Sequence, residues 1–178
     1  IGSKFSVVLA TGHQPTKKAI ENLDSKVLTS AIKAALELRS LLPKEKKNLP
    51  VGVLGVNPHA GESGLLGSEE DELIKPVIDA FRTEKSAVEG PLVPDAAFLP
   101  KMWKKYSVYV AAYHDQGLIP FKTVHQHQSG VHISMGLPFV RTSVDHGTAK
   151  DIFGRNIADY RSMLESIEWC IKLCSVKN

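Results

Sequence analysis

The sequence has few cysteines and no long apolar run, and these absences argue against secreted and membrane-spanning proteins. Its 178 residues include only two cysteines, Cys170 and Cys174. They lie four positions apart in an expected helix, where disulfide geometry is poor. We therefore expect core or half-buried thiols in a reducing cytoplasm. No apolar run reaches the roughly 18 residues that a membrane-spanning helix needs, and no secretory signal is visible, so we expect a cytoplasmic protein with no membrane partner.

Charge of one sign is also scarce. The formal net charge is only +3, and the two basic clusters, at residues 44–47 and 101–105, are interrupted by other side chains. Nucleic-acid binding calls for a concentrated basic patch or stripe. We therefore interpret these lysines as solvated surface and expect no nucleic-acid partner.

Apolar runs and helical patterns alternate along the chain, which is typical of an α/β domain with a largely parallel sheet. With 43% hydrophobic residues, a chain of this length can enclose one sizeable core, and no repeat or linker marks a second domain. The expected strands lie at 5–10, 49–56, 107–113, 131–135 and near 139, and the expected longer helices at 25–42, 68–84 and 159–174. Smaller features follow from single residues: a cap at Ser68, a kink at Pro76, a loop at 90–94, a short helix from Asp95, a polar loop at 125–128 and a helical turn at 148–154.

Four histidines lie in short motifs rich in Gly, Asp, Asn or Pro, at or soon after apolar runs: His13, His59, His114 and His146. Open α/β sheets bind ligands beyond the carboxyl ends of their strands, so these side chains can converge at one edge. Three imidazoles with an open position suit Zn²⁺ or a related divalent metal. His13, His59 and His114 are therefore candidate metal ligands. Their spacing matches no local zinc motif, so three hydrogen-bonded loop histidines are the alternative.

Two aspartates follow the same strand-end pattern. Asp95 and Asp115 could orient a metal-bound histidine, accept a proton or bind metal directly, although Asp95 could equally cap a helix. The glycines at 61, 64 and 67 match neither the dinucleotide nor the nucleotide phosphate-loop spacing. Because acidic residues follow them and would oppose an anion, we interpret this segment mainly as a tight connection.

Two basic residues downstream of the third strand could bind an anion. Lys122 and Arg141 could hold a phosphate or carboxylate together, the lysine as a point charge and the arginine through its planar fork. Isolated basic residues are equally compatible with plain surface charge.

Taken together, these motifs resemble the 4-hydroxythreonine-4-phosphate dehydrogenase family of pyridoxal phosphate biosynthesis. The resemblance rests on Asn-Pro-His-Ala-Gly-Glu at 57–62, Gly-Ser-Glu-Glu at 67–70, Tyr-His-Asp-Gln-Gly-Leu-Ile-Pro at 113–120 and the segment at 136–149. It implies an isocitrate/isopropylmalate dehydrogenase-like α/β fold with three layers around a largely parallel sheet. It also implies that these residues are the C-terminal portion of a two-domain fold, because the family's first half has no counterpart here.

The resemblance implies an NAD- or NADP-dependent oxidation of 4-phosphooxy-threonine, a 3-hydroxy acid, with decarboxylation to 3-amino-2-oxopropyl phosphate. A divalent metal, zinc, magnesium or cobalt, is implied at His13, His59 and His114. The family's acidic residues near the metal fall on Asp95 and Asp115, which become catalytic candidates. The family is a homodimer whose metal site takes ligands from both subunits. The implied substrate-binding residues are Lys122, His132 and Arg141.

The segment that begins at His146 is similar to the adenine-side cofactor loop of isocitrate and isopropylmalate dehydrogenases. This similarity accounts for a dehydrogenase without the dinucleotide glycine fingerprint, and it implies cofactor contacts from His146, Gly147, Thr148, Asp151 and Asn156. At position 132 the family typically has Asn, whereas this chain has His132, which is bulkier and carries charge below about pH 6.5. A related phosphorylated threonate or erythronate is therefore an alternative substrate.

Two other classes of protein are left open. A non-catalytic remnant that dimerises or binds a partner would account for the missing half, but it would have little reason to keep the three histidines, Lys122 and Arg141. A metal-dependent hydrolase could use the histidines, but it would not need the cofactor loop. Because half of the family's two-domain cleft has no counterpart, we expect weak metal binding and little turnover from this polypeptide alone.

Overall fold

The computed structural model describes residues 1–84, 86–126 and 129–177, and its residues cluster into two compact units. The larger unit is Phe5–Pro120, and the smaller one combines Ile1–Lys4 with Phe121–Asn178. The division falls inside one helix, α6 (His114–His125). A division inside a helix leaves no linker and no change of composition, which is why the sequence does not predict it.

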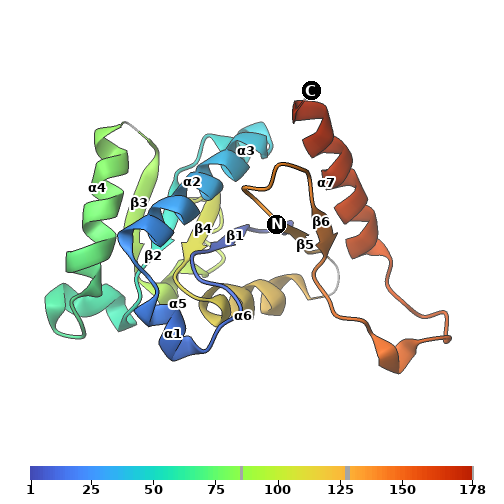
Figure 1. Ribbon diagram of the computed structural model, residues 1–178, viewed down its shortest axis with the longest axis horizontal. Helices are drawn as coiled ribbons and strands as arrows, with labels where there is room; N and C mark the ends of the chain where they lie inside the picture. Colours follow the sequence, from blue (N-terminus) through green and yellow to red (C-terminus); the bar gives the residue numbers. More distant parts are fainter. Residues whose placement is uncertain (85, 127–128, 178) are drawn as a thin grey trace. The chain divides into compact units, whose positions relative to one another are not determined.

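The larger unit is built on a four-stranded sheet with the strand order β1-β4-β2-β3 (Figure 1). Every neighbouring pair is parallel, which confirms the predicted α/β class. The central strands β2 and β4 are buried at every residue, as expected where both faces of a parallel sheet are covered. The strands are β1 (Val7–Leu9), β2 (Val51–Leu54), β3 (Val88–Leu92) and β4 (Val108–Ala111).

Strand β3 corrects one prediction. Gly90 and Pro91 favour a loop at 90–94, yet both lie within β3. Proline cannot donate a ladder hydrogen bond and is therefore tolerated on edge strands, and β3 is an edge strand that pairs with β2. Gly90 has φ +147°, and a Cβ at this position would lie 2.5 Å from the Val53 carbonyl oxygen. The close approach of the two strands therefore requires glycine here.

Helix α2 (Ser25–Leu41) packs on β1, β4 and β2 and is drawn in front of the sheet in Figure 1. Asp24 caps it, because the Val27 N–H donates to the Asp24 carboxylate at 2.7 Å. Its buried face consists of Leu28, Ala31, Ile32, Ala35 and Leu38. The short helices of this unit are α1 (Thr16–Glu21), α3 (Lys44–Lys47) and α5 (Pro94–Ala97).

The predicted helix at 68–84 forms as two segments, the π-helical η2 (Glu70–Ile74) and then α4 (Lys75–Thr83). Pro76 lies in the first turn of α4, where a missing N–H is tolerated. In place of the expected kink at Pro76, the chain changes from a π-helix to an α-helix between Ile74 and Lys75. Ser68 contributes its backbone carbonyl, which accepts from the N–H groups of residues 71 and 72 at 3.0 and 2.8 Å; this bonding replaces the predicted side-chain cap.

The smaller unit contains an antiparallel hairpin, β5 (Val131–Ile133) and β6 (Thr142–Val144), together with α7 (Arg161–Lys177). Strand β5 confirms the prediction at 131–135, and η3 (Lys150–Ile152) confirms the helical turn at 148–154. The predicted strand near Phe139 is wrong, because this residue lies in the connection between β5 and β6 and is 58% exposed. A short apolar run does not by itself distinguish a strand from a turn, because a strand forms only where another strand is available to pair with it.

Helix α7 packs on this hairpin through small polar residues. Ser162 and Ser166 are buried, and the Thr142 hydroxyl donates to the Ser166 carbonyl oxygen at 2.9 Å. Serine is small enough to let the helix backbone approach the strands closely. The terminal helix predicted at 159–174 is therefore confirmed, with a polar contact to the hairpin.

The apolar residues expected on one side of α7 are largely solvent-exposed. Met163 is 52% and Ile167 is 50% exposed. Cys170 is half-buried, as expected, but Cys174 is exposed, so the expectation of a core or half-buried thiol is wrong at that position. No helix in the described part of the chain is long and apolar enough to cross a membrane.

His125 corrects the predicted polar loop at 125–128, because it is the last residue of α6 and is buried. Its Nε2 atom accepts the Lys4 backbone N–H at 3.0 Å. Its Nδ1 atom lies 2.9 Å from the Phe121 carbonyl oxygen and therefore carries the proton. Both ring nitrogens are thus satisfied inside the smaller unit. His127 and Gln128 lie outside the described residues.

Candidate functional site

The three strands that precede the candidate metal ligands are neighbours in the order β1-β4-β2, so their carboxyl ends share one edge of the sheet. Buried Thr11 ties the loop after β1 to the end of β4, since its N–H and hydroxyl donate to the Ala112 carbonyl oxygen at 3.2 and 2.7 Å. Gln116 ties β4 to β2: its side chain accepts the Ala112 N–H and donates to the Gly55 carbonyl oxygen, both at 2.7 Å. These bonds fix where the histidine-bearing loops begin.

The structure brings two of the predicted ligands together. The ring centroids of His13 and His114 are 4.8 Å apart, with the ring planes inclined by 55°. His13 is exposed and His114 is half-buried. Two imidazoles at this separation can bind one cation or one anionic oxygen between them. Adjacency of β1 and β4, which carry these loops, accounts for the pairing.

Asp115 determines which nitrogen of His114 is available. The Asp115 Oδ1 atom lies 2.7 Å from His114 Nδ1, so Nδ1 carries a proton and Nε2 keeps its lone pair in the neutral ring. Carboxylates that bind one ring nitrogen in this way orient histidines that use the other nitrogen as a ligand. Of the roles predicted for Asp115, this contact favours orientation of His114.

His59 is the predicted ligand that the structure does not join to this pair. It is exposed and lies in η1 (Pro58–Gly64) with φ +53°. Helix α5, which carries the exposed Asp95, packs against η1. Within the described ranges, no three His, Cys, Asp or Glu side chains form a group that could hold a metal ion. One chain therefore brings together two of the three predicted ligands.

Glu70 is a buried residue at this edge that the sequence analysis gave no role. It is 2% exposed, and its carboxylate accepts hydrogen bonds from the backbone N–H groups of Val56 and Asn57, just beyond β2, at 2.7 and 2.8 Å. The Asn57 side-chain amide also lies 2.6 Å from Glu69, and this bond lowers the pKa of the Glu69 carboxyl. Glu70 belongs to a run of four acidic residues, and the sequence does not show which of the four faces inward.

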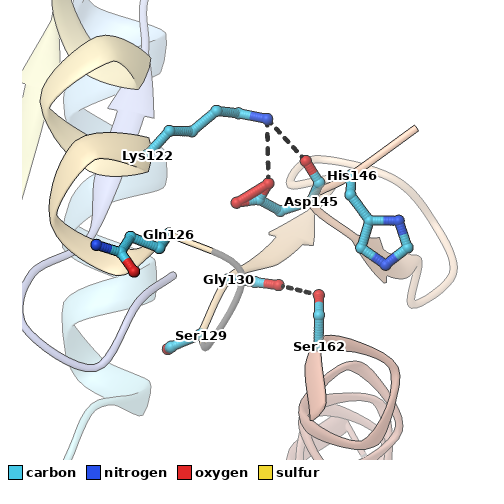
Figure 2. Close-up of a pocket in the computed structure, with 7 residues that line it drawn as sticks. All are labelled: Lys122, Gln126, Ser129, Gly130, Asp145, His146 and Ser162. Atoms are coloured by element: carbon cyan, nitrogen blue, oxygen red, sulfur yellow. Dashed lines mark hydrogen bonds and ion pairs between the residues drawn. The ribbon is translucent and has the colours of Figure 1, made fainter. Parts of the chain in front are cut away.

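Within the smaller unit, a pocket of about 450 Å³ is lined by two of the predicted site residues, Lys122 and His146. Figure 2 shows Lys122 reaching Asp145, with His146 beside it. The lysine ammonium lies 2.9 Å from the Asp145 carbonyl oxygen and 3.3 Å from Oδ1. The Asp145 side chain is only 17% exposed, so Lys122 is held over the pocket by an aspartate that the sequence analysis did not assign. The lining consists of Lys122, Gln126, Ser129, Gly130, Asp145, His146 and Ser162.

The other predicted substrate residues lie on the β5–β6 hairpin. The His132 Nδ1 atom lies 3.3 Å from the Ser143 hydroxyl of the paired strand. The Arg141 guanidinium donates to the Ser134 hydroxyl at 2.8 Å. Both side chains are exposed, and neither is among the lining residues of the pocket. They therefore do not form a single cluster with Lys122 around the pocket.

The predicted cofactor residues lie in the exposed segment that follows β6. His146 lines the pocket, and its Nδ1 atom is bonded to the Gly147 carbonyl oxygen at 2.9 Å. Asp151 lies in η3, and Asn156 has φ +55°. All of these residues are exposed, including Thr148, so the segment presents polar groups to solvent.

The fold and the site define an α/β protein with histidine-bearing loops at the carboxyl edge of a parallel sheet. Residues 1–170 match the family described as pyridoxal phosphate biosynthetic protein PdxA. The chain belongs to this family, as the motifs indicate.

Individual relatives agree with this assignment. A 4-hydroxythreonine-4-phosphate dehydrogenase of Desulfosudis oleivorans is 44% identical over 174 residues, 96% of this chain and 50% of the relative. An Oceanobacillus iheyensis protein, named provisionally as a D-threonate 4-phosphate dehydrogenase, is 43% identical over 98% of this chain and 52% of its own length. The Klebsiella pneumoniae 4-hydroxythreonine-4-phosphate dehydrogenase structure matches with a TM-score of 0.78 at 38% identity, over 96% of this chain and 50% of that one.

The chain spans about half the length of the relatives that it matches. The solved structure of the same family agrees with the predicted α/β fold. That the residues correspond to the C-terminal portion stays a prediction.

Proposed function

We propose that this chain is the catalytic portion of an NAD- or NADP-dependent dehydrogenase that oxidises 4-phosphooxy-threonine and releases CO₂. The observation that carries the proposal is the pairing of His13 with His114 at 4.8 Å in a chain of this family. In the reaction, the carbon that bears the 3-hydroxyl loses a hydride to the nicotinamide, and the hydroxyl loses its proton to a base. The resulting 3-oxo acid then breaks its bond to the carboxylate, and the carbon takes up a proton to give 3-amino-2-oxopropyl phosphate.

His13, His59 and His114 are the proposed ligands of a divalent cation, zinc, magnesium or cobalt, which would stabilise developing negative charge on the substrate oxygen. The paired His13 and His114 fit two of these three positions, and further ligands are proposed to come from the second subunit of a homodimer. The Asp115 carboxylate bonds Nδ1 of His114 and so leaves Nε2 as the proposed ligand atom of the neutral ring. Asp95 and Asp115 are the proposed acid and base groups because the family's acidic residues near the metal are expected at these two positions.

Lys122, Arg141 and His132 are the proposed substrate-binding residues. Lysine and arginine both suit a phosphate, and the Asp145 contact keeps the Lys122 ammonium in a fixed place. His146, Gly147, Thr148, Asp151 and Asn156 are the proposed cofactor contacts, supported by the likeness of their segment to the adenine-side loop and by the position of His146 at the pocket. We place the reaction in the cytoplasm, with no nucleic-acid or membrane partner.

D-threonate 4-phosphate is the second candidate substrate. It has a hydroxyl in place of the 2-amino group, and its oxidation and decarboxylation follow the same steps. Two observations favour it: the 43% identical relative with that provisional name, and His132 at the position where the family typically has asparagine.

The test measures NADH formation from each substrate with purified protein and added Zn²⁺, Mg²⁺ or Co²⁺. The mass and metal content of the protein from its native source are measured alongside. The Lys122→Met variant should lose turnover, whereas Lys101→Met, at an exposed lysine of the larger unit, should keep it. We expect slow turnover from the 178-residue chain and fast turnover from a longer native protein that carries stoichiometric metal. A native 178-residue product with neither metal nor NADH formation would contradict the proposal and favour a binding remnant.

A further inference from the structure

The buried carboxylate of Glu70 is the feature of the larger unit that the proposed reaction leaves unused. It lies in a run of four acidic residues, 69–72, in which Asp71 and Glu72 are exposed while Glu70 is 2% exposed. A buried carboxylate is costly unless hydrogen bonds or a cation compensate it. Among the ion pairs of the described ranges, none involves Glu70. Its compensation therefore comes from hydrogen-bond donors.

These donors all belong to the first residues beyond β2. The Oε1 atom of Glu70 accepts the backbone N–H groups of Val56 and Asn57 at 2.7 and 2.8 Å. The Oε2 atom accepts the Asn57 side-chain amide at 2.9 Å. Hydrogen bonds to an ionised acceptor are about twice as strong as neutral ones. The carboxylate thus fixes the backbone two residues before His59.

The turn that carries His59 needs such support. His59, Ala60, Glu62 and Ser63 all have positive φ angles, of 53°, 52°, 43° and 60°. The left-handed conformation is unfavourable for a non-glycine residue, so four such residues persist only where the surroundings hold them. Glycine at position 61 brings this turn against the carboxylate, since a Cβ there would lie 2.6 Å from Glu70 Oε2.

We propose that Glu70 is the positioning residue of the His59 turn: its carboxylate binds the Val56 and Asn57 amides and thereby holds His59 in one orientation. The Asn57 side-chain amide, which donates to Glu70 Oε2, adds a third hydrogen bond to this clamp. That His59 then serves as a metal ligand rests on the proposed function, whereas its positioning by Glu70 does not.

The test replaces the charge and keeps the shape. Glu70→Gln retains one oxygen acceptor, but its amide adds donors facing the donors of the clamp. The matched control is Glu69→Gln, which removes the charge of a carboxylate that bonds the Asn57 side chain but not the backbone N–H groups of Val56 and Asn57. Leu28→Ala, in the buried face of α2, controls for general loss of stability.

Two readouts follow the variants. The first is the imidazole NMR signal of His59, assigned by its loss in His59→Asn, in metal-free protein. The second is Co²⁺ affinity by titration calorimetry. We expect Glu70→Gln to shift or broaden the His59 signal and to weaken Co²⁺ binding about tenfold or more, the range for groups that orient metal ligands. The two control variants should leave the His59 signal in place.

An unchanged His59 signal in folded Glu70→Gln would overturn the proposal, and so would an equal change in Leu28→Ala. If Glu70→Gln does not fold, Asn57→Ala, which removes the side-chain amide that bonds both Glu69 and Glu70, must shift the His59 signal more than Glu69→Gln does for the proposal to stand. If the unmodified chain binds no Co²⁺ but Glu70→Gln still moves the His59 signal, the positioning role is supported and the metal part of the proposed function fails.

Discussion

Replacing Tyr109 by phenylalanine should stabilise the larger unit. Tyr109 is fully buried in β4, and among the described residues its hydroxyl has no hydrogen-bond partner. Its ring packs against Phe5, Phe98 and Tyr106 at centroid distances of 5.8, 5.0 and 5.6 Å. The substitution keeps these ring contacts and removes only the unsatisfied oxygen.

The size of the effect follows from the burial of that one group. A buried polar group without a partner costs about 1–3 kcal/mol, so Tyr109→Phe should gain about 1 kcal/mol, or roughly 2–4 °C in melting temperature for a chain of this size. Tyr106→Phe is the matched control, because the Tyr106 hydroxyl is hydrogen-bonded to Glu89. Its loss should cost about 1 kcal/mol. Urea unfolding of the three proteins at pH 8 measures both changes.

Alkaline pH should enlarge the difference. Burial, with a smaller contribution from Tyr106, raises the pKa of Tyr109 well above its ordinary value. Because the folded state keeps the Tyr109 proton to a higher pH than the unfolded state, this titration leaves the free energy of unfolding unchanged below the unfolded pKa of about 10. The free energy of unfolding then falls as the pH rises through the interval between the unfolded and folded pKa values. The loss approaches about 1.4 kcal/mol per pH unit, and Tyr109→Phe should remove this share of it. A Tyr109→Phe protein less stable than the parent at pH 8, or a stability gap that does not grow above pH 10, would refute the reasoning.

Three further changes test other contacts. Gly130→Ala should weaken phosphate binding at the pocket in a calorimetric titration, because its Cβ would lie 2.5 Å from Asp145 Oδ2 and displace the carboxylate that holds Lys122; unchanged affinity would contradict that contact. Asp24→Ala should cost about 1 kcal/mol of unfolding free energy by removing the cap of α2, whereas Asp24→Asn should cost much less. His125→Phe should destabilise the smaller unit by about 1–3 kcal/mol, since it removes the two hydrogen bonds that the buried ring makes with the backbone of Lys4 and Phe121, and amide hydrogen exchange in β5 and β6 should speed up accordingly.

Local sequence patterns predict the parts of the fold that they control. Strands β1, β2, β4 and β5 appear where apolar runs predict them, and helix α2 appears where the helical pattern predicts it. Strand β3 could not be found this way, because Gly90 and Pro91 resemble a loop until the strand is known to lie at a sheet edge. The strand predicted near Phe139 does not form, because the apolar residues of this exposed connection have no strand to pair with.

The candidate site divides in the same way. The motifs identify His13 and His114, and the strand-end rule correctly predicts that their loops meet. Glu70 and Asp145 escape notice because each stands beside other acidic or polar residues, and burial alone distinguishes them. The sequence also suggests that Lys122 and Arg141 bind one anion together. In the structure Lys122 contacts Asp145, whereas Arg141 contacts Ser134.

The sequence by itself determined the family and the α/β class, because long motifs and the alternation of apolar runs with helical patterns are written in residue order. Only the tertiary structure decided which side chains meet. The neighbours of β4 placed His13 beside His114, and the inward turn of one carboxylate among four placed Glu70 against the amides beyond β2. Hydrogen bonds and burial between residues distant along the chain depend on strand order and helix packing, which local sequence does not encode.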